Sequence, residues 1–351
     1  MTTLGALGGW PAVLTRLMAG GDLSRAEAAA ALSEVLDGGA TPAQLAAFLT
    51  ALRMKGETVE ELTGLVEAVL AHAEPMPVDG ADAVVDTCGT GGDRSGSINV
   101  STLTALVVAG AGARVVKHGN RAASSATGSA DVLEALGVRV DLGAGGVLRC
   151  LEASGMAFCF APRFHPAFRH AGPTRRELGV PTVFNFLGPL ANPARPGRQV
   201  VGVASPPMAE RMARVLAANG VRRAMVVYGH DGLDELTTTT TSTVVEVADG
   251  AVVTTTVDPA ELGLAPATVG DLRGGDASVN AEAVRRLLDG EGGPRRDVVL
   301  LNSAAAAVVA GLAADLAEGL EVAAASLDEG RAGSVLERLV AASNAEAPVG
   351  A

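Results

Sequence analysis

The densest run of residues that could bind a ligand is Gly89-Thr90-Gly91-Gly92-Asp93. It follows an apolar run, Ala83 to Val85, that predicts a buried strand, and it precedes a stretch from Asn99 to Gly110 that predicts a helix. A glycine loop between strand and helix presents backbone N–H groups to an anion, because glycine takes positive φ and allows close approach. We interpret this loop as a cradle for a phosphate or pyrophosphate. The alternative is an ordinary tight turn.

Two adjacent carboxylates, Asp234 and Glu235, follow another predicted strand at residues 223–228. Neighbouring carboxylates repel one another, so they are a poor choice for stability alone. Mg²⁺ takes one or two carboxylates together with phosphate oxygens and water. We therefore interpret the pair as Mg²⁺ ligands beside the phosphate cradle, with a pair of solvated acids as the alternative.

A cationic stretch, Lys117-His118-Gly119-Asn120-Arg121, ends a third predicted strand at residues 113–117. The ends of parallel strands meet at one edge of a sheet, so this stretch is expected to face the glycine loop. Lys117 could neutralise phosphate charge, and Asn120 or Ser125 could hydrogen-bond a sugar or a phosphate. A solvated loop is the alternative for the stretch taken alone.

The segment from His165 to Pro193 is rich in polar residues that a core does not need. Arg175 or Arg176 could form a bidentate pair with a carboxylate, and surface salt bridges to Glu177 are the alternative. No Ser-His-Asp set or activated cysteine stands in a convincing context. Together these groups suit the displacement of a pyrophosphate-type leaving group by electrostatics and positioning.

Strands alternate with helices through the middle of the chain, which predicts a mostly parallel α/β sheet. The sheet follows an N-terminal helical region, residues 1–74, marked by capping boxes that begin at Ser24, Thr41 and Thr58. Pro75 and Pro77 mark a linker between the two. Further predicted strands are 156–161 and 199–204, predicted helices are 129–136, 145–154 and 207–219, and a hairpin is predicted around Asp249-Gly250. The tail from Asp297 is predicted to be helical, with a further capping box at Ser334.

The composition narrows the class of protein. Apolar residues make up 48% and charged residues 19% of the 351, as in a globular protein. A net charge of −12 argues against a nucleic-acid partner, which needs a basic face. The three cysteines have no metal-like spacing, and neither a signal peptide nor an apolar stretch of about 18 residues is found, so we expect a cytoplasmic protein without a membrane span.

The motifs quoted above, in their order along residues 10 to 345, resemble those of the anthranilate phosphoribosyltransferase family. Two further matching motifs are Asn99-Val100-Ser101-Thr102 and Asn185-Phe186-Leu187-Gly188-Pro189-Leu190. The resemblance implies transfer of the phosphoribosyl group from 5-phosphoribosyl-1-pyrophosphate (PRPP) to anthranilate in tryptophan biosynthesis, with pyrophosphate released. It implies a helical domain, residues 1–74, hinged to an α/β domain, residues 75–351, with about 166–190 packing back at the hinge. It also implies a homodimer formed through the helical domains.

The resemblance assigns a role to individual residues. Lys117 and Arg175 are the expected catalytic groups, and Arg175 is expected to pair with the anthranilate carboxylate. Mg²⁺, expected as two ions per subunit, would be held by Ser101, Asp234 and Glu235. The residues expected around PRPP are Gly89, Thr90, Gly91, Gly92, Asp93, Asn99, Ser101, Thr102, Lys117 and Ser125, and those expected around anthranilate are Gly89, Asn120, His165, Arg175, Gly188 and Pro189. The chain departs from many relatives in the threonine run 237–241 that follows the acid pair.

Two alternative functions remain open at this point. A pyrimidine nucleoside phosphorylase would share the architecture and a related glycine loop, but would need inorganic phosphate and no Mg²⁺. A non-catalytic nucleic-acid-binding relative on the same scaffold would want a basic surface, which a pI near 4.9 disfavours.

Overall fold

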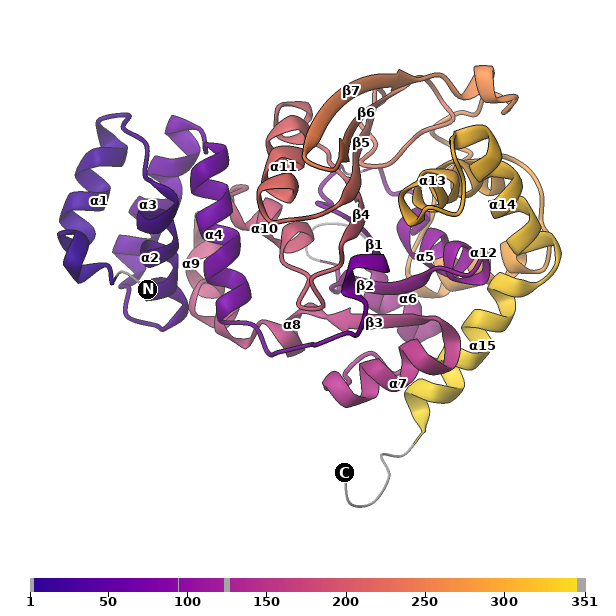
Figure 1. Ribbon diagram of the computed structural model, residues 1–351, viewed down its shortest axis with the longest axis horizontal. Helices are drawn as coiled ribbons and strands as arrows, with labels where there is room; N and C mark the ends of the chain where they lie inside the picture. The colour runs from indigo at the N-terminus through magenta and orange to yellow at the C-terminus, as the bar shows by residue number, and fades with distance from the viewer. Residues whose placement is uncertain (1–2, 94, 123–126, 346–351) are drawn as a thin grey trace.

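The computed structural model describes residues 3–93, 95–122 and 127–345. A small bundle of helices lies at one end of the molecule, and a larger α/β part makes up the rest (Figure 1). The predicted fold class, a helical N-terminal domain followed by an α/β domain, is confirmed. No helix in the described ranges combines the length and apolar character that a membrane span requires.

The N-terminal bundle contains α1 (Gly9–Met18), α2 (Arg25–Leu36), α3 (Pro42–Lys55) and α4 (Val59–Ala71). The three predicted capping boxes are present: the side chains of Ser24, Thr41 and Thr58 each accept a hydrogen bond from the N–H three residues later, and the Glu or Gln at that position accepts one from the cap N–H. These bonds satisfy N–H groups that the first helical turn leaves unpaired. Local sequence therefore determines where three of the helices begin.

The α/β part is built on one seven-stranded sheet in the order β3-β2-β1-β4-β5-β6-β7. The first five strands in that order run parallel, and the β5–β6 and β6–β7 pairs are antiparallel. The strands are β1 (Val84–Gly89), β2 (Arg114–Gly119), β3 (Met156–Phe160), β4 (Arg198–Gly202), β5 (Arg223–Gly229), β6 (Ser242–Ala248) and β7 (Ala251–Val257). Asp249 and Gly250 both take positive φ, 46° and 86°, so the predicted β6–β7 hairpin turn is confirmed.

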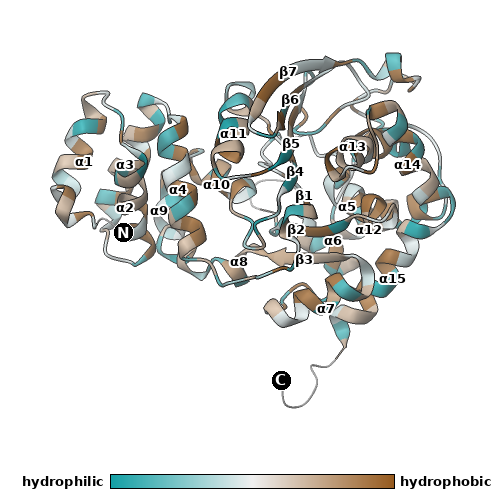
Figure 2. Cartoon of the chain, viewed as in Figure 1, coloured by the Kyte–Doolittle hydropathy of each residue, from teal (hydrophilic) through white to brown (hydrophobic). Residues whose placement is uncertain are grey.

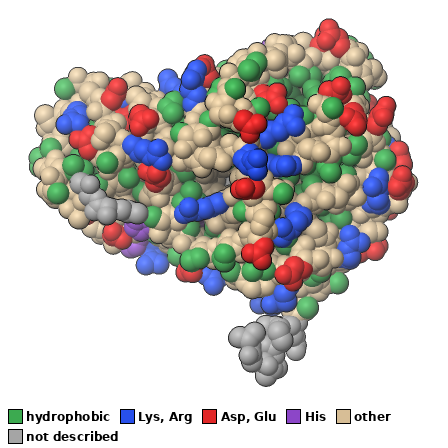
Figure 3. Space-filling view, viewed as in Figure 1, with side chains coloured by type: hydrophobic (Ala, Val, Ile, Leu, Met, Phe, Trp, Pro, Cys, Tyr) green, Lys and Arg blue, Asp and Glu red, His purple; other side chains and the backbone are tan. Residues whose placement is uncertain are grey.

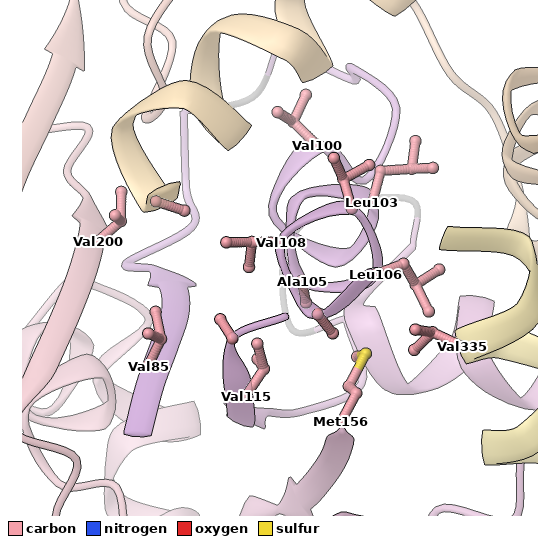
Figure 4. Close-up of a cluster of buried hydrophobic side chains, with 14 of the residues drawn as sticks. Val85, Val100, Leu103, Ala105, Leu106, Val108, Val115, Met156, Val200 and Val335 are labelled. Atoms are coloured by element: carbon pink, nitrogen blue, oxygen red, sulfur yellow. The ribbon is translucent and has the colours of Figure 1, made fainter. Parts of the chain in front are cut away.

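Helix α5 (Val100–Gly110) lies at the centre of the larger core. Its side chains pack against Val85 and Val115 of the sheet on one side and against Val335 on the other (Figure 4). Hydrophobic and hydrophilic residues alternate along the helices of both parts (Figure 2). The remaining helices of this part are α6 (Ser129–Ala135), α7 (Ala144–Ser154), α11 (Pro206–Ala218), α12 (Ala277–Leu288), α13 (Pro294–Ala310), α14 (Leu316–Asp328) and α15 (Arg331–Asn344).

A second core joins the bundle to the opposite face of the sheet. Between β3 and β4 the chain forms the short helices α8 (Ala161–Phe164), α9 (Gly172–Leu178) and α10 (Phe184–Leu190). Helix α9 packs on α3, and α10 packs on α4 and α11. The stretch that carries His165 and Arg175 is therefore wedged between bundle and sheet.

One sequence prediction is wrong. Ser334 does not cap a helix, because α15 begins at Arg331 after Gly330, which takes φ of 70°. The Ser334 N–H donates to the Gly330 carbonyl oxygen at 3.0 Å, an ordinary bond inside a helix. Glycine in the left-handed region starts the helix earlier than the serine signal indicates.

Candidate active site

The site lies at the point where the strand order reverses. Strands β1 and β4 are neighbours, and the chain leaves them in opposite directions, which opens a crevice beyond their carboxyl ends. A cavity of about 330 Å³ occupies this position. Eleven of the predicted residues line it: Gly89, Thr90, Gly91, Gly92, Asp93, Asn99, Ser101, Lys117, Asn120, Asp234 and Glu235.

The glycine loop takes the backbone conformation that its sequence predicts. Gly91 and Gly92 have φ of 63° and 85°, a region that other residues rarely enter. The Gly91 N–H donates to Oδ2 of Asp234 at 2.8 Å. One of the N–H groups that could bind a phosphate oxygen is therefore bonded to the acid pair, so the glycine loop and the acid pair are in direct contact.

Glu235 is buried and Asp234 is half-buried, and both lie beside other acids. Burial raises the pKa of Asp234 to about 7, and repulsion from Asp93 adds to the shift. Burial and repulsion from Asp234 raise the pKa of Glu235 well above its ordinary value. Lys117 opposes the shift of Glu235 only in part, and a divalent metal ion would stabilise the charged forms of both carboxylates.

The oxygen ligands present suit Mg²⁺ that is bound together with substrate phosphates, and they do not suit a metal ion enclosed by protein side chains alone. No group of three or more His, Cys, Asp and Glu side chains that could enclose a metal occurs in the described part of the chain. Mg²⁺ is commonly bound by one or two carboxylates together with substrate phosphates and water. The Ser101 hydroxyl lines the same cavity as the two acids and is available as a further oxygen ligand.

Lys117 lies below the glycine loop, at the base of the cavity. Its side chain is 1% exposed, and its Nζ donates to the Thr87 carbonyl oxygen and, at 3.1 Å, to the Ser101 hydroxyl. Burial lowers the pKa of Lys117, while the nearby Asp86 carboxylate opposes that shift. The lysine charge thus reaches the cavity from beneath and at the same time holds Ser101 in place.

The C-terminal part of the chain completes the cavity wall, which the sequence did not indicate. Asn280 of α12 is 2% exposed, and its Nδ2 donates to Oδ1 of Asn99 at 2.8 Å. Its own Oδ1 accepts from the Gly275 N–H at 2.8 Å. The bond to Asn99 fixes the orientation of the Asn99 amide. The two asparagines are 181 residues apart, so no local pattern could have paired them.

Of the described residues predicted around PRPP, Thr102 does not line this cavity. Thr102 is fully buried in α5, and its hydroxyl has no partner within the described ranges. Ser125 lies outside the described residues.

Of the residues predicted around anthranilate, Gly89 and Asn120 line the cavity itself, and His165 and Gly188 lie beside it, next to His118. The Nδ1–H of His118 donates to the Gly188 carbonyl oxygen at 3.1 Å. The His118 and His165 rings meet edge to face with centroids 5.1 Å apart, and His165 stacks on Phe168 at 5.2 Å. His118, which also lines the cavity, therefore links the phosphate side to His165 and Gly188. No role for His118 was predicted from the sequence.

Arg175 lies at the far end of this row of rings. Its guanidinium sits 4.9 Å from the centroid of Phe184, which in turn contacts Phe168. Arg175 is half-buried and Arg176 is exposed. Neither forms an ion pair with any described acid, including Glu177. The Arg175 fork is thus held by an aromatic face and remains available to a carboxylate.

The buried histidine pair makes the fold sensitive to acid. Burial lowers the pKa of His118 to about 3 and that of His165 to about 4, whereas histidine in an unfolded chain titrates near pH 6.5. Below about pH 6.5 the unfolded chain binds protons that the folded chain rejects, so stability falls by up to ~1.4 kcal/mol per pH unit for each histidine. The raised pKa values of Asp234 and Glu235 act in the opposite direction over this range, so the histidine contribution is measured as a difference from wild type. Lowering the pH from 7.5 to 5.5 should change the stability of His165→Leu in urea more favourably than it changes that of wild type. An equal change in His165→Leu, with His170→Leu as the exposed control, would contradict it.

Comparison with known proteins agrees with this architecture. Residues 11–73 match the model of a glycosyl transferase family, helical bundle domain, and residues 81–333 match the model of a glycosyl transferase family, a/b domain. The chain is 56% identical over 335 residues to an anthranilate phosphoribosyltransferase of Rhodococcus jostii, covering 94% of this chain and 92% of that protein. The chain belongs to the anthranilate phosphoribosyltransferase family.

Solved structures of the anthranilate phosphoribosyltransferase family share the fold over nearly the whole chain. The enzyme from Thermus thermophilus is 42% identical with a TM-score of 0.89, covering 95% of this chain and 99% of that one. The enzyme from Saccharomyces cerevisiae in complex with PRPP and Mg is 27% identical with a TM-score of 0.86, covering 95% and 97%. The family predicted from the sequence motifs is confirmed, and these relatives give no support to the phosphorylase or the nucleic-acid-binding alternative.

Proposed function

We propose that this chain transfers the phosphoribosyl group of PRPP to the amine of anthranilate and releases pyrophosphate, the step that its family performs in tryptophan biosynthesis. The observation that carries the proposal is one cavity in which the glycine loop, Lys117 and the pair Asp234–Glu235 converge at the reversal point of the sheet. The direct test is the loss of anthranilate fluorescence on mixing protein with PRPP and Mg²⁺. No loss with folded protein, or phosphorolysis of a pyrimidine nucleoside without Mg²⁺, would overturn it.

The residues around the cavity act on PRPP by holding charge. The N–H groups of Gly91 and Gly92, the amide of Asn99 and the charge of Lys117 would bind the phosphates, with Thr90, Asp93 and Ser101 around them. Ser101, Asp234 and Glu235 would hold Mg²⁺, for which we propose two ions per subunit. When bound, Mg²⁺ supplies charge that stabilises the pyrophosphate as it leaves.

The chemistry asks for positioning more than for a strong base. As the bond from C1 to pyrophosphate breaks, C1 gains oxocarbenium character and negative charge grows on the leaving group. Fixed donors aimed at that charge lower the barrier most when they need no rearrangement. His118, whose Nε2 has no partner among the described residues, and neutral His165 would orient the anthranilate amine toward C1.

Arg175 is proposed to bind the anthranilate carboxylate, with Asn120, Gly188 and Pro189 lining the path. Losing one charge-assisted contact costs about 1.5–3 kcal/mol, or about tenfold to hundredfold in affinity. Arg175→Ala should therefore raise KM for anthranilate by about that factor and leave KM for PRPP near its wild-type value. Steady-state kinetics with each substrate varied in turn would measure this. The same rise in Arg176→Ala, with Arg175→Ala unaffected, would contradict the choice of arginine.

We infer that residues 1–74 and 75–351 act as two domains that close on the acceptor, with 166–190 at the hinge. A cavity of about 1190 Å³ lies between helices α2 and α4 on one side and the 195–197 loop and the end of α11 on the other, which leaves room for movement. Movement there would carry His165 and Arg175, because their segment packs on the bundle.

A cytoplasmic location is supported by three cysteines that are all buried and free.

A homodimer through the helical domain is proposed because α3 presents an apolar stripe. Ala43, Ala47 and Met54 fall at helical spacing on exposed positions, and Met54 is 84% exposed. Met18 at the end of neighbouring α1 is 74% exposed. Met54→Glu should therefore convert a dimer into a monomer in size-exclusion chromatography with light scattering. A dimer in Met54→Glu that is lost instead in Val253→Glu, on exposed β7, would place the interface elsewhere.

A further inference from the structure

Helix α13 carries a polar side chain in the most buried part of the protein. Every residue from Val298 to Ala310 is buried, and Asn302 in their midst is 1% exposed. Burying an amide is unfavourable unless its hydrogen bonds are made. We therefore expect Asn302 to make hydrogen bonds to groups that an apolar side chain would leave unpaired.

The partner is the backbone of Leu236, the residue directly after the acid pair. Oδ1 of Asn302 accepts from the Leu236 N–H at 3.0 Å, and Nδ2 donates to the Leu236 carbonyl oxygen at 2.8 Å. Nδ2 also donates to the Val298 carbonyl oxygen at 2.9 Å, which fixes the amide on its own helix. Both amide hydrogens and one of the two acceptor lone pairs of Asn302 are thus used. Two of these three bonds are made to Leu236, in the loop that carries the acid pair.

That loop has no strand or helix of its own to hold it. Residues 230–241 form turns and bends between β5 and β6. Near its surface the Asp231 carboxylate accepts from the hydroxyls of Thr237 and Thr239 at 2.8 and 2.5 Å. The threonine run thereby ties the two ends of the loop together, and Asn302 holds its middle from beneath.

We propose that Asn302 is a positioning residue for Asp234 and Glu235. The Leu236 N–H belongs to the peptide that joins it to Glu235, so Asn302 sets the direction in which the Glu235 side chain leaves the backbone. A misplacement of about 1 Å in such a group can cost about 10²-fold in rate. This inference rests on the proposed function, in which the two carboxylates bind Mg²⁺.

The test compares Asn302→Asp with Ser303→Ala. The aspartate variant keeps an acceptor for the Leu236 N–H and loses both donated bonds, including the one to the Leu236 carbonyl. Ser303 is the next residue on the helix, equally buried, and its hydroxyl has no partner in the described part of the chain, so its removal leaves the loop untouched. Because substrate phosphates complete the proposed metal site, Mn²⁺, which suits the same oxygen ligands, is titrated into each protein together with PRPP, with PRPP alone as the blank. Free Mn²⁺ is followed by electron paramagnetic resonance.

We expect Asn302→Asp to weaken Mn²⁺ binding about tenfold and to raise KM for PRPP, with KM for anthranilate unchanged and Ser303→Ala equal to wild type. Asn302→Ser, a smaller change, serves the same comparison where the aspartate variant does not fold. Mn²⁺ affinity equal to wild type in a folded Asn302 variant would overturn the inference and leave the proposed function standing. If the Asp234→Asn/Glu235→Gln double variant bound Mn²⁺ as tightly as wild type, both the inference about Asn302 and the proposed function would be overturned.

Discussion

An Asp234→Asn/Glu235→Gln double variant is expected to lose at least about 10³-fold in kcat/KM. Removing a single charge-stabilising donor from an active site costs about 10²–10³-fold, and this change removes both carboxylates that would hold the metal ion. The same exchange leaves the size of both side chains unchanged. Anthranilate fluorescence decay at saturating PRPP and Mg²⁺ measures the loss.

This double variant should lose activity without losing folding stability. Both acids have pKa values raised by burial, which means that their charged forms are unfavourable in the folded chain. Neutral amides at these positions should therefore not lower the urea midpoint at pH 8. Asp249→Asn, at an exposed hairpin turn, is the matched control and should keep full activity. A double variant that unfolds, or one that retains activity, would each contradict the role given to the pair.

Gly202→Ala is expected to be the most damaging single methyl group in the chain. Gly202 ends β4 directly under the acid pair, and a Cβ there would lie 1.6 Å from the Asp234 carbonyl oxygen. Because the obstacle is backbone, the loop itself must move. Overpacking of this kind typically costs about 1–3 kcal/mol, and we expect at least the upper end, about 3 kcal/mol, in urea unfolding.

The control for this prediction is Gly333→Ala in α15. A methyl group at Gly333 would meet nothing within 4 Å, so the gain in helix propensity should stabilise the protein by up to ~1 kcal/mol. Gly202→Ala should also weaken Mn²⁺ binding, since Asp234 is displaced. A urea midpoint equal to wild type, together with normal Mn²⁺ binding, would show that the loop is not held at this spacing.

The sheet explains why groups so far apart in the sequence share one site. The glycine loop leaves β1 and the acid pair leaves β5, while β4 between them ends in a glycine that lets the two loops touch. Charged side chains of both signs are scattered over the outer face (Figure 3), in keeping with an acidic protein whose basic groups act locally. In the proposed function, anion binding depends on Lys117 and a few N–H groups, and net charge does not decide it.

Local signals were sufficient for the parts of the site that the chain builds within a few residues. Glycine spacing predicted the loop after β1, and capping boxes predicted the starts of α2, α3 and α4, because each depends on bonds between near neighbours. Asn280 and Asn302 carry no such signal. Each is one asparagine in an amphipathic or apolar helix, and its partner is fixed only when the C-terminal helices pack against the sheet.

The sequence also could not show how deeply Lys117 is buried. Lys117 was predicted at the end of its strand, facing a phosphate, and the structure places it beneath the loop, bonded to Thr87 and Ser101. A parallel strand that is covered on both faces is buried without alternation, so its sequence pattern does not distinguish a core position from the floor of a cavity. At Ser334 a left-handed glycine outweighed a serine-to-glutamate spacing that had no structural role.

The most direct test of the proposed site is a crystal structure of the protein soaked with PRPP and Mn²⁺, with anomalous data collected for the metal. We predict an anomalous peak bound by Asp234 and Glu235, with the pyrophosphate of PRPP against the N–H groups of Gly91 and Gly92. In that complex the bond from the Gly91 N–H to Asp234 would be replaced by one to a phosphate oxygen. A peak away from both carboxylates, or PRPP bound outside the crevice between β1 and β4, would contradict the site described above.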